Sequence, residues 1–108
     1  MRFRFDDLVA VMARLRGDQG CPWDRQQTHQ SLKRFLIEEA YEAVEAIEEA
    51  DYAALCDELG DLLLQVVLHA ELADERGDFD LTDVLHSIAA KLVRRHPHVF
   101  GSTVVADA

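Results

Sequence analysis

Two apolar stretches of the sequence each contain a pair of acidic residues three positions apart. Glu39 and Glu42 lie in "IEEAYEAVEAI", and Glu58 and Asp61 lie in "DELGDLLLQVVLHA". Three residues turn a helix by about 300°, so each pair presents two carboxylates on one helix face. In an antiparallel hairpin that bends at Ala50, Glu39 lies level with Asp61, about 16 Å from the bend at a rise of 1.5 Å per residue. Glu42 lies level with Glu58, about 12 Å from the bend, so the spacing predicts four carboxylates facing one another.

This acid set is suited to a hard divalent cation. Facing carboxylates are costly to desolvate without a counter-charge, and Mg²⁺ or Mn²⁺ prefers oxygen ligands and is often completed by substrate phosphates. The set contains no His or Cys, which disfavours zinc, and no Glu-x-x-His, which disfavours a di-iron site. The spacing leaves a second interpretation open, a solvated acidic helix face, which is the interpretation for Glu45, Glu48 and Glu49.

Three further features could take part in chemistry. Glu38 points about 100° away from Glu39, so it either activates a water beside the metal or faces solvent. The segment "KLVRRHPHVF" places Lys91, Arg94 and Arg95 on one side of a helix end, where they either contact phosphate oxygens or stabilise the negative helix terminus. Trp23, the only tryptophan, either stacks on a base or fills the core.

Four helices are predicted to carry these residues. Apolar residues recur at helical spacing in each, and caps or breakers mark the ends. Thr28 or Ser31 caps the second helix, Asp51 the third and Asp80 the fourth, and Gly77 ends the third. The predicted ranges are about 5–16, 28–49, 51–76 and 80–96, with a turn-rich loop "GDQGCPWD" after the first.

Composition indicates one all-α domain over residues 1–108. The chain has two prolines, five glycines and a net charge of −10, and that charge argues against a nucleic-acid duplex or an anionic membrane as partner. No apolar run is long enough to span a bilayer, the N-terminus has no signal-peptide pattern, and two widely spaced cysteines fit a cytoplasmic protein. The segment "LLLQVVLHAEL" is apolar around most of its helix, which favours a homo-oligomer that covers it.

Together, "GCPWDRQQTHQSLKRFLIEEAYEAVEAI", "DELGDLLLQVVLHAELA" and "KLVRRHPHVF" closely resemble the MazG family of nucleoside triphosphate pyrophosphohydrolases. The resemblance covers residues from about 8 to 101. The family's EExxE motif falls on Glu38, Glu39 and Glu42, its ExxD motif on Glu58 and Asp61, and its KxxRR motif on Lys91, Arg94 and Arg95.

The resemblance implies an antiparallel all-α four-helix bundle that dimerises and hydrolyses (d)NTPs to monophosphate and pyrophosphate. It implies Mg²⁺, replaceable by Mn²⁺, on the four paired acids, Glu38 as the group that assists water, and triphosphate contacts from KxxRR. The chain differs at Phe35 and Leu68, where some catalytic copies carry Lys and Asn. Its motifs match the N-terminal copy of two-domain members, so the alternative is a catalytically quiet dimerisation or regulatory domain of a longer chain.

Overall fold

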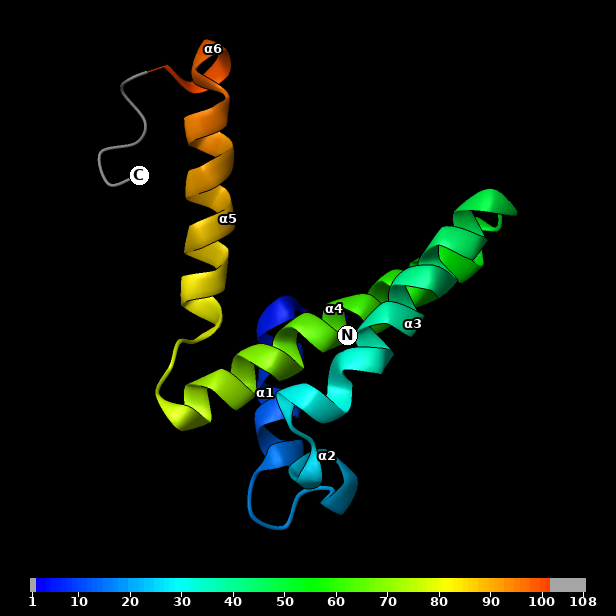
Figure 1. The fold of residues 1–108 in the computed structure, drawn as a ribbon, viewed down its shortest axis with the longest axis vertical. Coiled ribbons are helices and arrows are strands. Elements are labelled where there is room, and N and C mark those ends of the chain that lie inside the picture. The colour runs from blue at the N-terminus through cyan, green and yellow to red at the C-terminus, as the bar shows by residue number, and fades with distance from the viewer. Residues whose placement is uncertain (1, 102–108) are drawn as a thin grey trace.

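A computed structural model describes residues 2–101, which form an all-α structure with no strand in that range. The four long helices that the sequence predicts are confirmed, and two short helices accompany them (Figure 1). In chain order the helices are α1 (Phe5–Arg16), α2 (Pro22–Gln26), α3 (His29–Glu48), α4 (Tyr52–Arg76), α5 (Leu81–Arg95) and α6 (Pro97–Phe100). Within residues 2–101, no helix combines the length and the apolar character needed to cross a membrane.

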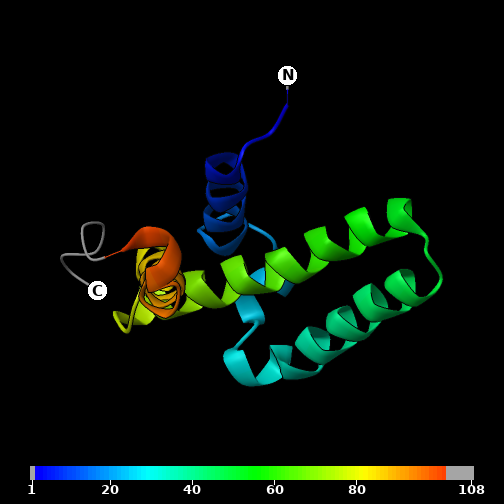
Figure 2. The ribbon, with the colours of Figure 1, turned by 90° about the horizontal axis from the view of Figure 1, so that it is seen from above.

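Helices α3 and α4 form the antiparallel hairpin that the acid spacing requires (Figure 2). The Thr28 hydroxyl accepts a hydrogen bond from the Ser31 amide at 3.0 Å and so caps α3. At the bend, Ala50 adopts the left-handed conformation with φ of 55°, and the Asp51 carboxylate caps α4 by accepting from the Ala54 amide at 3.1 Å. These local features fix the bend at the position from which the level pairing follows.

The core forms where α1 crosses the hairpin near its open end. Its buried residues come from α1, α3 and α4: Met12, Leu32, Val67, Leu68 and Leu72. Partly buried residues pack around them, Phe35 of α3 among them. The core therefore holds α3 and α4 together at the open end of the hairpin. The acid pairs lie between this core and the bend.

Arg16, the last residue of α1, holds the connection between α1 and α3. Its guanidinium donates to both carboxylate oxygens of Glu75, at 2.6 and 2.9 Å, and to the backbone carbonyls of Asp24 and Gln27. The Arg16 side chain is only 9% exposed. Its hydrogen bond and charge hold the pKa of Glu75 below its usual value, so this ion pair persists to lower pH than a free carboxylate would allow.

Replacing Arg16 with methionine should lower the free energy of unfolding at pH 7 by about 2 kcal/mol. The variant removes the Arg16 hydrogen bonds to two backbone carbonyls, of which that of Asp24 keeps a longer bond from the Gln27 amide at 3.4 Å, while the 39% exposure of the Glu75 side chain limits the ion pair's share. Urea denaturation of this variant and of Arg14→Met, an exposed position on the same helix, measures the effect.

The ion-pair share of the Arg16 contribution should be present above the ordinary Glu pKa of 4.5 and disappear as pH falls through the lowered Glu75 value, whereas the share from the two carbonyl hydrogen bonds should persist. Equal losses in the two variants at pH 7 would contradict the role given to Arg16.

Helix α5 projects away from the hairpin in Figure 1 and is seen end-on beside the end of α4 in Figure 2. Within the described chain it contacts only α4 and α6, and none of its residues is buried. Its apolar face, made by Leu85, Ile88 and Leu92, is about half exposed. The four long helices therefore do not close into a bundle within one chain, because the apolar face of α5 has no neighbour there.

The two short helices start at prolines. Residues 17–24 were predicted as a turn-rich loop, but Pro22 begins α2, because proline is suited to the first turn of a helix. Pro97 likewise ends α5 and begins α6, since it cannot continue the preceding helix but can start a new one.

Candidate metal centre

The structure brings the two predicted acid pairs together between α3 and α4. Glu39, Glu42, Glu58 and Asp61 each offer one carboxylate oxygen, and these four oxygens lie within 4.8 Å of one another. We name this set the acid cluster. The level pairing inferred from the hairpin is therefore observed, and it follows from a bend placed midway between the pairs.

Two members of the acid cluster point inward and two are open to solvent. Glu39 and Glu58 are partly buried, whereas Glu42 and Asp61 are exposed. The Oε2 atoms of both Glu39 and Glu58 are buried without any hydrogen-bond partner. Buried carboxylate oxygens without a donor are costly, so the cluster has the electrostatic character of a site that a cation completes.

The pKa values of the inward pair reflect this environment. A hydrogen bond with Glu42 is the main cause that raises the pKa of Glu58 to about 7, and burial and the neighbouring negative charges add to it. For Glu39, burial is the main cause of the raised pKa, followed by the charges of Asp61, Glu42 and Glu38. Without a cation, the Glu58 carboxyl is therefore partly protonated near neutral pH, and that of Glu39 binds a proton more readily than an ordinary glutamate.

The donor set fits a hard divalent cation. It consists of carboxylate oxygens alone, and these are the ligands that Mg²⁺ and similar ions prefer over the nitrogen and sulfur of zinc sites. A cation among these oxygens would displace the proton from Glu58 and offset the charge of the buried Oε2 atoms. The acid cluster could therefore bind a metal.

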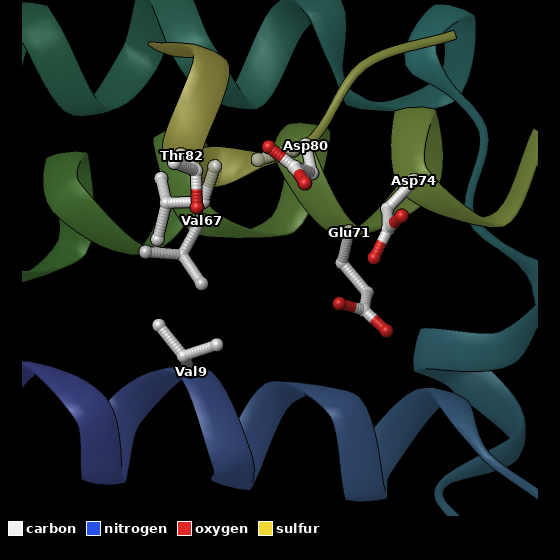
Figure 3. A pocket seen from close by; sticks show the side chains of 8 residues that line it. Val9, Val67, Glu71, Asp74, Asp80 and Thr82 are labelled. Atoms are coloured by element: carbon white, nitrogen blue, oxygen red, sulfur yellow. The ribbon is translucent and has the colours of Figure 1, made fainter. Parts of the chain in front are cut away.

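Other acids of the described chain do not form such a set. Glu71, Asp74 and Asp80 line a pocket between α1, α4 and the start of α5 (Figure 3). Burial raises the pKa of Glu71, but these three acids do not come close enough to share an ion. Among residues 2–101, the acid cluster is the only group of three or more potential ligands that does.

Glu38 is exposed and lies beside the acid cluster rather than in it. Its charge contributes to the raised pKa of Glu39, which places it near that carboxylate. A solvent-facing carboxylate next to a cluster is positioned to contact water.

The predicted phosphate-contacting residues are not brought to the acid cluster within one chain. Lys91, Arg94 and Arg95 lie on the C-terminal half of α5, which points away from the hairpin (Figure 1). These residues could therefore contact a phosphate held at the acid cluster only if they came from a second copy of the chain.

Trp23 neither fills the core nor lies free in solvent. It is 51% exposed, and its ring meets Phe35 edge-on with centroids 6.0 Å apart. Phe35 precedes Glu39 by one helical turn, so the Trp23–Phe35 pair lies on the same side of α3 as the acid cluster.

Gln65 and His69 continue the polar face of Glu58 and Asp61 along α4, and sequence reasoning missed the partner of His69. His69 contacts His29 of α3, with 2.7 Å between their Nδ1 atoms. Gln65 is 6% exposed, and the Oε1 atom of Gln65 and the Nε2 atom of His69 are buried without a hydrogen-bond partner. The hairpin register could have found this pair, because His29 and His69 lie nearly equally far from the bend.

Comparison with known proteins gives the family. Residues 27–100 match the family model of the MazG nucleotide pyrophosphohydrolase domain. The chain is 56% identical over 99 residues to the nucleoside triphosphate pyrophosphohydrolase/pyrophosphatase MazG of Thermotoga maritima, covering 92% of this chain and 39% of that protein. It is 46% identical over 101 residues to the nucleoside triphosphate pyrophosphohydrolase of Escherichia coli K12, covering 93% of this chain and 38% of that protein.

A third relative is the uncharacterized protein YabN of Bacillus subtilis, 52% identical over 103 residues, which cover 95% of this chain and 21% of YabN. The chain thus spans less than two fifths of the length of these relatives. The family match includes α3, α4 and α5, and therefore every residue of the acid cluster. The chain belongs to the MazG nucleotide pyrophosphohydrolase domain family.

Proposed function

We propose that the chain hydrolyses (d)NTPs to (d)NMP and pyrophosphate, with Mg²⁺ as the cofactor and Mn²⁺ able to replace it. The observation that supports this most directly is the convergence of four carboxylate oxygens within 4.8 Å, two of the carboxylates with a buried unpaired oxygen. Family membership and the names of the Thermotoga and Escherichia relatives support the same reaction class.

The acid cluster would hold the divalent cation, and Glu38 would assist the attacking water. When bound, the cation supplies positive charge that offsets the charge of the triphosphate. Water attacks the α-phosphorus, the bond from this phosphorus to the bridging oxygen breaks, and pyrophosphate leaves with the bonding electron pair. Glu38 accepts the proton of the water, consistent with its exposed position beside the cluster.

Lys91, Arg94 and Arg95 would bind the triphosphate from a second copy of the chain. Within one chain α5 points away from the α3–α4 hairpin (Figure 1), and its apolar face is about half exposed. Helix α3 exposes a complementary apolar groove, lined by Leu36, Ile37, Ala40, Tyr41 and Val44. A homodimer would bury such surfaces and let basic residues reach a phosphate at the partner's cluster.

Replacing Ile88 with aspartate should convert the protein to a monomer and lower NTP hydrolysis at least about tenfold. A charge in the middle of the α5 apolar face is costly to bury, and the basic residues would lose their position. Analytical ultracentrifugation measures the mass, and His86→Asp, at an exposed position on the same helix, is the matched control. Dimers formed equally by both variants would exclude α5 from the interface.

A second candidate function is a catalytically quiet dimerisation or regulatory domain within a longer protein. It is favoured by Phe35 and Leu68, which stand where some catalytic copies carry Lys and Asn, and Leu68 is buried in the core. This role keeps the dimer surfaces but does not need turnover.

Incubation of the purified chain with each common NTP and dNTP and with Mg²⁺ distinguishes the two functions. We expect equal amounts of monophosphate and pyrophosphate from at least one nucleotide, and none when EDTA replaces Mg²⁺. A folded protein that releases no pyrophosphate from any nucleotide would remove the enzyme and leave the quiet domain.

A further inference from the structure

His29 and His69 join α3 to α4 through the edges of their rings. The rings are nearly parallel, at 9°, with Nδ1 atoms 2.7 Å apart and ring centroids 5.0 Å apart. The distance between the ring centroids exceeds the distance between the Nδ1 atoms by about one ring diameter. The two nitrogens therefore lie between the rings, which meet edge to edge. This is the geometry of a hydrogen bond between two imidazoles, not of rings stacked face to face.

Such a hydrogen bond needs one protonated and one unprotonated Nδ1. A neutral imidazole has one donor and one acceptor nitrogen, whereas a charged ring has two donors. The bond therefore forms when both rings are neutral, and it survives one added proton if the charged ring donates to the neutral one. A second added proton places a hydrogen on both Nδ1 atoms and breaks the bond.

The surroundings of His69 disfavour the protonated, charged form of its imidazole. It is partly buried, and its Nε2 has no hydrogen-bond partner. Burial is the main cause that lowers the pKa of His69, and the charge of His29 adds to it. His29, by contrast, opens onto a pocket between the helices.

The charged groups around that pocket favour the singly charged pair over the doubly charged one. Arg16 of α1, Arg25 of α2 and Arg76 of α4 line it, and Glu75 of α4 is the acid among them. Arg16 and Glu75 pair with each other, and Arg76 pairs with Asp78 at 3.2 Å. A second positive charge on the histidine pair therefore finds no free carboxylate among these lining residues.

The pair lies at the open end of the hairpin. His29 is the first residue of α3, and His69 follows Asp61 by about two helical turns on α4. The covalent bend fixes the other end of the hairpin, and the acid cluster lies between the two ends. The spacing of the two helices at the cluster thus depends on contacts at both ends.

We propose that His29 and His69 form a proton-dependent latch, which holds the first turn of α3 against α4 while at least one ring is neutral and releases it when both are charged. The latch makes the folded hairpin less stable in acid. Because the folded state favours neutral His69, the unfolded state binds more protons just below the ordinary His pKa of 6.5. Stability should therefore fall as pH drops through 6.5, and the loss is complete below the lowered value.

NMR spectroscopy of the unmodified chain, labelled with ¹⁵N at histidine, tests the bond directly. We expect a coupling across the hydrogen bond between the Nδ1 atoms of His29 and His69 at pH 8, and its loss at acidic pH while the protein is still folded. His86, His96 and His98 serve as internal controls, because no imidazole-to-imidazole bond involves them in the described structure. A folded protein at pH 8 without this coupling would overturn the latch.

Chemical denaturation between pH 8 and pH 5 tests the consequence for stability. Relative to His69→Gln, the unfolding constant of the unmodified chain should rise tenfold for each unit by which the His69 pKa is lowered. His86→Gln, an exposed position on α5, should follow the unmodified chain. The acid cluster is the same in all three proteins, so its effect on stability cancels in this comparison. An unfolding-constant ratio that does not change with pH would contradict the latch, whatever the activity of the protein.

Discussion

Replacing Glu42 with glutamine should lower kcat/KM for (d)NTP hydrolysis at least about 100-fold, since even an outer-shell change at a metal site costs 10- to 100-fold. The Glu42 carboxylate belongs to the acid cluster and is the hydrogen-bond partner of Glu58. Glutamine keeps the size of the side chain but removes the charge that a divalent cation needs. Steady-state pyrophosphate release at fixed Mg²⁺ measures the loss.

Glu45→Gln is the matched control, because Glu45 is exposed on the same helix and lies outside the acid cluster. In EDTA the Glu42→Gln protein should unfold at a temperature no lower than the unmodified chain, since the variant removes repulsion rather than packing. Full turnover in Glu42→Gln would mean that the metal is held elsewhere.

Mn²⁺ at 100 times its dissociation constant should stabilise the folded chain by about 2.7 kcal/mol, as expected for an ion that binds only the folded state. In a domain of this size that corresponds to a rise in Tm of roughly 10 °C or more. The reason is structural: the four ligand oxygens converge only when α3 and α4 form the hairpin. Thermal unfolding followed by circular dichroism, with Mn²⁺ or with EDTA, measures the shift.

The same titration on two variants assigns the shift to the acid cluster. Asp61→Asn should lose most of it, whereas Asp57→Asn, an exposed position one turn earlier on α4, should keep it. Equal shifts in both variants would place the binding site outside the cluster.

The sequence predicts the hairpin and the cluster well because local signals determine both. Thr28 and Asp51 have side chains that cap helices, and the bend at Ala50 lies between two helical patterns. Once the bend is fixed, 1.5 Å of rise per residue puts Glu39 level with Asp61 and Glu42 level with Glu58. The acid cluster therefore follows from the position of the bend and the regular rise of the two helices.

The features that the sequence did not predict depend on contacts between distant elements. The amphipathic pattern of α5 shows that one face needs cover, but not that the face remains open within a single chain. The contact between His29 and His69 was missed because the hairpin register was applied only to the acidic residues, although it also places these two histidines at nearly equal distances from the bend. The start of α2 at Pro22 was missed because turn residues surround it.

Anomalous X-ray diffraction from crystals grown with Mn²⁺ shows whether the acid cluster binds a divalent cation. We expect an anomalous peak among the side-chain oxygens of Glu39, Glu42, Glu58 and Asp61. A peak at another site only, or a crystal of folded protein with saturating Mn²⁺ and no peak among these four oxygens, would contradict it.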